Sequence, residues 1–184
     1  MTATTSSMPR AIRRFGRDRR GVSAVEFAFI APVMIGLYLG CVEISDGVAA
    51  DRKVSLIAGA LANLTAQATT ILPADMTDIF NASGAIIAPY DAGKLTMTVT
   101  CVSIDANKNA NVKWSVAQSG PVKTGTLTIP PVLDKPNTQL IYSEVSYAYT
   151  PIVGYTISGT LTLSDHMYMS PRITPPNYNG KACT

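Results

Sequence analysis

The feature that most constrains this chain of 184 residues is an apolar stretch from Val22 to Val42 that contains a single charged residue, Glu26. In helical conformation these 21 residues extend about 32 Å, the thickness of the hydrocarbon core of a bilayer. Charged residues make up only 15% of the whole chain, below the roughly 25% of a typical soluble domain. The stretch therefore predicts a transmembrane helix over residues 22–42, with a buried core helix as the alternative.

Positive charge is concentrated immediately before this stretch. Residues 1–20 contain six arginines and one aspartate, a net charge of +5, whereas the whole chain carries +3, so the remainder carries −2. Because Lys and Arg are enriched on the cytosolic side of membrane helices, residues 1–21 are predicted to form a cytosolic leader. The residues after Glu43 are then expected on the far side of the membrane, and their charge gives no indication of nucleic-acid binding.

The segment that follows, residues 43–91, is predicted to be helical. Apolar residues recur from Glu43 to Thr70 at the three- and four-residue spacing of one helical face: Val54, Ile57, Leu61, Leu64 and Ala68. The transmembrane helix is expected to continue into this segment. A second helix is expected from Asp75 to about Ile87, just before Pro89.

From residue 92 to residue 172 the apolar period changes to two, which indicates strands. Apolar residues alternate with threonine from Leu95 to Cys101, and the polar run 105–111 predicts a turn. The next strand is expected to contain Val112, Trp114 and Val116 on one face. Three further strands are expected at Thr126–Ile129, Leu140–Tyr149 and Tyr155–Leu163. Their Thr and Ser residues are expected to face solvent, and residues 173–184 are expected to be irregular. Helices followed by closely connected strands predict an α+β fold with a helix packed on an antiparallel sheet.

The three cysteines differ in position. Cys41 lies at the outer end of the predicted membrane span and is most simply a small apolar residue. Cys101 and Cys183 both fall on the predicted exported side, where an oxidising compartment permits a disulfide. This candidate disulfide would close a loop of roughly 80 residues; the alternative is two free thiols, with Cys101 simply buried.

The sequence contains little that points to catalysis. Its single histidine, His166, excludes a site of several histidines, and common metal, nucleophile and phosphate-loop motifs do not occur. Asp165 and His166 are candidates for half of a catalytic pair, but nothing singles out a third member. We therefore expect no enzymatic activity and no cofactor. Five tyrosines on the predicted strands are expected to pack, or alternatively to form a carbohydrate- or surface-binding patch: Tyr142, Tyr147, Tyr149, Tyr155 and Tyr168.

Two arginines and Gly21, followed by four small or apolar residues and then Glu26-Phe27, resemble the processing site of type IV pilin-like proteins. The resemblance implies that prepilin peptidase removes the leader after Gly21, which makes Val22 the first residue, Glu26 the fifth and Phe27 the sixth. In that family the glutamate pairs with the N-terminal amine of a neighbouring subunit, which would neutralise both charges in an apolar filament core. A glycine at the cleavage point is also expected to favour a local break in the helix.

The Glu-Phe pair, Pro32, Glu43 and the stretch from Ile141 to Arg172 together resemble the TadE-like pseudopilins of the tight-adherence (Flp) pilus system. The resemblance implies a minor pseudopilin or pilus assembly protein in the bacterial inner membrane, with one span, a cytosolic N-terminus and a periplasmic C-terminal domain. The implied partners are prepilin peptidase, other pilins and pseudopilins, the inner-membrane assembly platform and membrane lipid. Assembly through the apolar helix, and incorporation into a surface pilus, are further expectations.

Other interpretations of the N-terminal region stay open. Val48 and Ala50 lie three residues and one residue before Asp51, a spacing that fits cleavage by a secretory signal peptidase. Gly40-Cys41 weakly suggests a lipoprotein signal. The alternative function is an uncleaved, single-pass, membrane-anchored periplasmic binding protein whose sheet captures a ligand or surface polymer, and a membrane-anchored hydrolase is a third.

Overall fold

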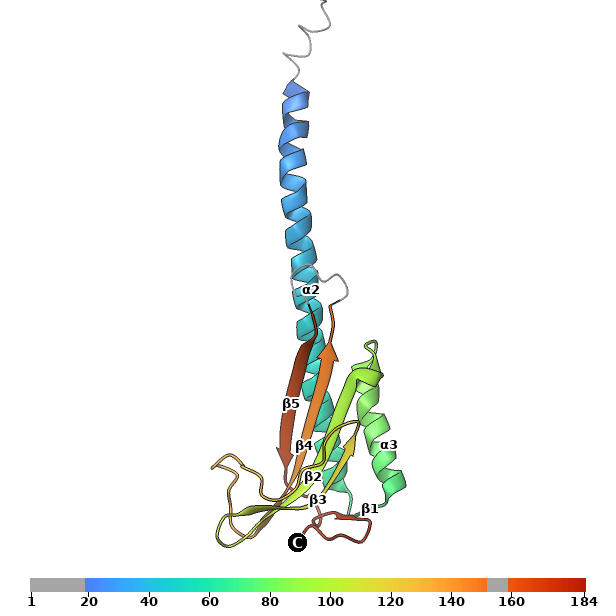
Figure 1. Ribbon diagram of the computed structural model, residues 1–184, viewed down its shortest axis with the longest axis vertical. Coiled ribbons are helices and arrows are strands. Elements are labelled where there is room, and N and C mark those ends of the chain that lie inside the picture. Colours follow the sequence, from blue (N-terminus) through green and yellow to red (C-terminus); the bar gives the residue numbers. More distant parts are fainter. Residues whose placement is uncertain (1–18, 152–158) are drawn as a thin grey trace, which may run out of the picture. The chain divides into compact units, whose positions relative to one another are not determined.

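The computed structural model describes residues 19–151 and 159–184 (Figure 1). The chain divides into two compact units, Met1–Val42 and Glu43–Thr184. Helix α2 (Arg19–Gln67) contributes to both units, and helix α3 (Pro73–Gly84) belongs to the second. The predicted strand Tyr155–Leu163 lies partly outside the described residues.

Helix α2 is a single element of 49 residues with Pro32 in its interior. The prediction that the apolar stretch continues into the following helix is confirmed, although the helix ends at Gln67 rather than at Thr70. Proline removes one backbone donor from a helix without necessarily ending it. The second predicted helix begins earlier than expected, because Pro73 occupies the first turn, where a missing N–H costs nothing. A 3₁₀ turn follows it at Ala85–Ile87.

An antiparallel sheet of four strands in the order β3-β2-β4-β5 forms the rest of the second unit. Its strands are β2 (Leu95–Ile104), β3 (Ala110–Gln118), β4 (Thr138–Tyr149) and β5 (Leu161–Met169). A β-bulge between Cys101 and Val102 shifts the pairing of β2 with β3 by one residue. The predicted α+β class is therefore confirmed.

The main core lies between one face of this sheet and the second half of α2. Val54, Ile57 and Leu61 are fully buried there, as their spacing predicts. The hydroxyl of Ser143 on β4 donates to the Ala58 carbonyl of α2 at 2.7 Å, which ties helix to sheet. The prediction for Leu64 is wrong: its side chain is exposed, because a three- and four-residue repeat drifts around the helix and leaves this position at the margin of the buried stripe.

The opposite face of β2 was expected to be open to solvent, and this is also wrong. Thr98 and Thr100 are buried, and the Thr98 hydroxyl donates to the carbonyl of Pro121. A second, smaller apolar cluster forms where Leu127, Ile129 and Leu133 pack on residues of β2 and β4. The segment after β3 therefore covers this face as a loop.

The strand predicted at Thr126–Ile129 is not formed in this loop. Only one bridge, between Asn111 and Thr126, joins the segment to β3. Gly125, with a positive φ of 78°, precedes the segment, and two prolines follow it. Regular strand conformation is therefore interrupted on both sides. Apolar alternation over four residues was too short a pattern to decide between strand and packed loop.

The C-terminal segment is more regular than predicted. Strand β6 (Asn177–Tyr178) pairs in parallel with strand β1 (Thr70–Ile71), which directly follows α2. Two residues give no readable periodicity, and their pairing partner lies about a hundred positions earlier in the chain. The prediction of an irregular tail over 173–184 is therefore wrong at this point.

Candidate functional site

Gly21, the predicted cleavage position, lies inside helix α2 rather than at a break. The helix already begins at Arg19 and continues through Gly21 without interruption. A single glycine costs a helix only about 1 kcal/mol relative to alanine, so the expected local break is not formed. A Cβ atom added at Gly21 would meet no other atom within 4 Å, and a larger side chain there has no steric consequence for the fold.

Val22, Glu26 and Phe27 lie on the same exposed helical segment. Val22 is 59% exposed and Phe27 is 71% exposed, and Glu26 is also exposed. Within the described residues, Glu26 takes part in no hydrogen bond or ion pair. None of the residues that the structure describes holds these three side chains, and such exposed positions are available to a peptidase, a membrane or a neighbouring molecule.

The remainder of the first unit presents apolar side chains to its surroundings. Large exposed hydrophobic residues of the segment 22–42 include Val25, Phe29, Ile30, Val33, Met34, Ile35, Leu37, Tyr38 and Val42. Among the described residues, α2 is the one helix that is long and apolar enough to cross a membrane. Such a surface is unfavourable in water and is typical of membrane or protein contact.

The second unit begins with polar residues of α2 that are anchored to the sheet domain. Glu43 is buried, with 3% of its surface exposed. The Tyr90 hydroxyl lies 3.1 Å from both the backbone carbonyl and the carboxylate of Asp46. Burial, followed by the hydrogen bond and negative charge of Asp46, raises the pKa of Tyr90 to about 12. Nearby, Lys53 donates to the carbonyls of Ile86 and Ala88 at 3.1 and 2.7 Å.

These anchoring contacts were not predicted. They join residues 33 to 44 positions apart, and no sequence period links such positions. Lys53 and Tyr90 look like ordinary surface residues in the sequence, and only the fold shows that they fasten the segment 85–90 to α2.

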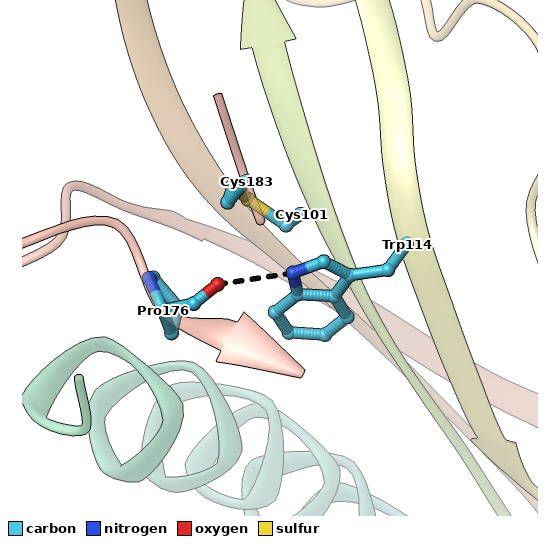
Figure 2. The surroundings of a disulfide bond; sticks show 4 residues. All are labelled: Cys101, Trp114, Pro176 and Cys183. Atoms are coloured by element: carbon cyan, nitrogen blue, oxygen red, sulfur yellow. Dashed lines mark hydrogen bonds between the residues drawn. A yellow bond between two sulfur atoms is a disulfide. The ribbon is translucent and has the colours of Figure 1, made fainter. Parts of the chain in front are cut away.

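Cys101 and Cys183, the candidate pair, are joined by a disulfide in the structure, with Cα atoms 5.9 Å apart (Figure 2). Both residues are buried in the main core. Beside them, Trp114 Nε1 donates to the Pro176 carbonyl at 3.1 Å, and the Trp114 ring lies 5.6 Å from that of Tyr178. Cys41 is a free, exposed cysteine.

Residues 172–183, named the C-terminal strap, pack against the end of α2. The Arg172 N–H donates to the Ala66 carbonyl at 3.0 Å, in the last turn of the helix, where carbonyls lack helical partners. The amides of Asn177 and Asn179 donate to the carbonyls of Thr69 and Ile71. The strap therefore satisfies backbone acceptors that the helix end and β1 would otherwise expose.

Asp165 and His166 do not form a catalytic pair. They are neighbours on β5, so their side chains point to opposite faces of the sheet. The Asp165 carboxylate instead accepts from the backbone N–H of His166 at 2.8 Å. In the described part of the chain, no three metal-ligating side chains converge.

The tyrosines separate into two groups on the two faces of the sheet. On the core face, Tyr147 and Tyr149 pack with Tyr90 at ring distances of 6.2 and 6.3 Å. On the opposite face, Tyr142 packs with Tyr168 at 4.9 Å. Burial and the neighbouring carboxylate of Glu144 raise the pKa of Tyr142 to about 12. Tyr155 lies outside the described residues.

The comparisons with known proteins agree with the geometry of α2. A protein family described as TadE-like protein matches residues 21–58. No curated protein and no solved structure matches the chain. The matched segment starts at Gly21, covers the exposed apolar part of α2 and ends within the part that packs on the sheet.

Proposed function

We propose that this chain, a TadE-like membrane protein associated with the tight-adherence pilus system, acts as a minor pseudopilin that is cut after Gly21 and assembles through α2. It is inserted in the bacterial inner membrane with its leader in the cytosol and its second unit in the periplasm. The leader's arginines support that orientation. We further propose that the protein has no catalytic activity of its own.

The observation that carries the proposal is the position of the family match on the helix. Residues 21–58 combine an apolar segment with exposed side chains and a segment whose side chains are buried in the sheet domain. The first segment needs lipid or other apolar helices around it, because its large apolar side chains are exposed in the described part of its own subunit. A helix of this kind suits a subunit that is stored in a membrane and later packed against other pilin helices.

Glu26 supports the same proposal. An ionised carboxylate inside a bilayer or an apolar bundle costs a few kcal/mol unless it is neutralised. Glu26 has no partner within the described residues of its own chain, so the compensating charge has to come from elsewhere. The amine that cleavage after Gly21 would create on Val22 of a neighbouring subunit is a suitable partner.

The fold argues against the secretory signal alternative. Cleavage before Asp51 would cut α2 within the second unit and remove Ala50, which is fully buried in the main core. It would also remove Asp46 and so the hydrogen bonds that hold Tyr90. The lipoprotein alternative is not affected by this argument, because Cys41 precedes the second unit.

Intact mass and N-terminal sequencing of the protein from its own membranes test the cleavage. We expect a mature chain that begins at Val22. Replacing Gly21→Leu should block maturation and leave the precursor mass, while the fold is undisturbed because the added side chain meets nothing. Ala24→Leu, on the same exposed turn, is the control and should mature normally. A wild-type chain that begins at Met1, Thr2 or Cys41 contradicts the proposal.

A second experiment tests the role of Glu26. Glu26→Ala should abolish incorporation into sheared pili while membrane insertion and cleavage persist, because only contacts between subunits lose their charge partner. Ser23→Ala, an exposed neighbour on the same helix, is the control. Unchanged recovery of the Glu26 variant in the pilus fraction would remove the pairing role.

Further partners follow from the proposed function. Prepilin peptidase is needed for the cut, lipid surrounds α2 before assembly, and the inner-membrane platform and other pilins receive the mature subunit. The competing function, an uncleaved membrane-anchored binding protein, predicts that both the Gly21 and Glu26 variants behave like the wild type.

A further inference from the structure

Strands β4 and β5 lie side by side in the sheet (Figure 1). Three of their cross-strand pairs lie on the face that points away from the main core. The pairs are Ser146 with Ser164, Glu144 with His166, and Tyr142 with Tyr168. Because side chains alternate along a strand, residues two positions apart share one face. This outer patch, defined by the six residues, therefore carries two hydroxyls, then a carboxylate beside an imidazole, then the rings of Tyr142, which is buried, and Tyr168, which is half-buried.

A shallow hollow adjoins the patch on the side of β2. It has a volume of about 180 Å³ and is lined by Thr96, Thr98, Pro121, Lys123, Glu144 and Ser146. Every lining side chain except that of Pro121 carries a hydrogen-bonding group. The hydroxyls of Thr96 and Ser146 lie 2.6 Å apart and fix one another's positions.

An ion pair lines this hollow. Lys123 Nζ lies 2.6 Å from Glu144 Oε2, and the two side chains are 31% and 38% exposed. A lysine ammonium has three donors and a carboxylate has about four acceptor positions, so both groups keep capacity for further hydrogen bonds. A ligand hydroxyl can therefore donate to Glu144 and accept from Lys123 without separating them.

The aromatic part of the patch is held in a fixed arrangement. The His166 ring stands edge-on to the Tyr168 ring at 5.6 Å and lies 5.9 Å from that of Tyr142. His166 is exposed and Tyr168 is half-buried, so ring surface is accessible next to the polar hollow. A ligand that has both hydroxyls and apolar C–H faces matches these neighbouring surfaces.

From this arrangement we infer that the outer patch and its hollow bind a neutral glycan, with Glu144 and Lys123 bonded to sugar hydroxyls and a sugar ring packed on Tyr168 and His166. An anionic ligand is disfavoured, because the charge of Lys123 is already balanced by Glu144. A purely apolar partner is disfavoured too, because it would desolvate the ion pair without replacing its hydrogen bonds. The inference goes beyond the pseudopilin role and does not depend on cleavage or assembly.

Calorimetric titration of the full-length protein tests this inference. The protein is held in a zwitterionic detergent without a sugar headgroup and titrated with cellohexaose, laminarihexaose and N-acetylchitohexaose. We expect at least one of these neutral probes to bind with a Kd on the order of 1 mM or tighter. Glu144→Gln and Tyr168→Ala should each weaken that binding roughly tenfold, and His166→Ala provides a second ring variant should Tyr168→Ala fold poorly.

The matched control is Thr162→Ala, an exposed residue of the same strand that pairs with Ala148, one row beyond Ser164. It should bind like the wild type. Trp114 belongs to the main core, so unchanged Trp114 emission in each variant shows that the fold is intact. Absence of binding to all three probes up to ~10 mM, or binding that the Glu144 and Tyr168 variants leave unchanged, overturns the inference. If the patch variants are lost from the pilus fraction while the wild type binds none of the glycans, the glycan inference is also overturned and the patch is assigned to protein contact.

Discussion

The two parts of helix α2 differ sharply in what surrounds their side chains. Between residues 22 and 42, large apolar residues such as Leu37 are exposed, whereas Leu61 in the second part is fully buried. Both parts belong to one uninterrupted helix. The same secondary structure therefore serves two purposes: one part is stabilised by its own subunit and the other requires an environment that the subunit does not provide.

The pattern of residues explains this difference. In the second part, small and apolar residues recur on one face and polar residues such as Asp51 and Arg52 lie on another, which is typical of a helix packed on a sheet. In the first part, apolar residues occupy all sides, which is typical of a helix surrounded by lipid or by other helices. Substitutions in the second part of α2 should therefore affect the stability of the fold, whereas substitutions in the first part should affect contacts with its surroundings.

The largest effect on the free energy of unfolding is expected from substitution of the two disulfide-bonded cysteines, which both lie in the second unit. Replacing Cys101→Ala and Cys183→Ala together should lower the free energy of unfolding by about 4 kcal/mol, since the bond spans 82 positions and restricts the unfolded chain. Release of the C-terminal strap should also remove the Pro176 carbonyl from Trp114. Denaturant titration followed by tryptophan emission measures both consequences.

Cys41→Ala is the matched control, because Cys41 is exposed in the first unit and should leave both the denaturation midpoint and the emission unchanged. Peptide mapping under non-reducing conditions should recover Cys101 and Cys183 in one linked pair of peptides. Free thiols at both positions in protein isolated from the cell envelope would contradict the disulfide.

A smaller effect is expected from a pair of leucines on the same helix. Leu61→Ala should cost about 3 kcal/mol in unfolding free energy, because it leaves a cavity in the main core. Leu37→Ala should leave that free energy unchanged, because the side chain is 63% exposed. Under the proposed function it should instead weaken association of the subunit with other pilin helices. Denaturation of the purified chain and recovery in the pilus fraction measure the two properties. Equal destabilisation by both variants would remove the distinction between the two parts of α2.

Sequence periodicity predicted the elements that depend on local pattern. The long helix, strands β2 and β4, and the turn near Asp105 all follow from repeated apolar spacing or from clustered polar residues. In that turn the Asp105 carboxylate accepts from the backbone N–H groups of Asn107 and Asn109 at 2.8 Å, the interaction for which such residues are favoured. The processing residues were identified by resemblance, and the family match begins at Gly21.

Features that depend on distant parts of the chain could not be predicted in the same way. The loop that buries Thr98 is joined to β2 by contacts such as that from Thr98 to Pro121, 23 positions away. The contact between Tyr90 and Asp46 spans 44 positions, and that between Trp114 and Pro176 spans 62. The ion pair of Lys123 with Glu144 is of the same kind. In each case the local sequence around the two residues does not indicate which distant residue each one contacts.

The smallest of the three effects on the free energy of unfolding is expected at Tyr90, and this effect should depend on pH. Tyr90→Phe removes the hydrogen bonds to Asp46 and should lower the free energy of unfolding by about 1 kcal/mol near neutral pH. Folding raises the pKa of this hydroxyl from its ordinary 10.0 to about 12, chiefly through burial and then through Asp46. The neutral phenol therefore stabilises the fold fully below pH 10, and this stabilisation is lost as pH rises through about 12.

Denaturant titrations between pH 8 and about pH 12 should show the wild type and Tyr90→Phe converging as the pH increases. Tyr38→Phe is the control from the first unit. Its side chain is 69% exposed and contributes nothing to the core of the second unit, so this variant should follow the wild type throughout. A constant difference between wild type and Tyr90→Phe across the whole range would show that the contribution of the hydroxyl does not depend on its proton, and would contradict the stabilising hydrogen bonds to Asp46.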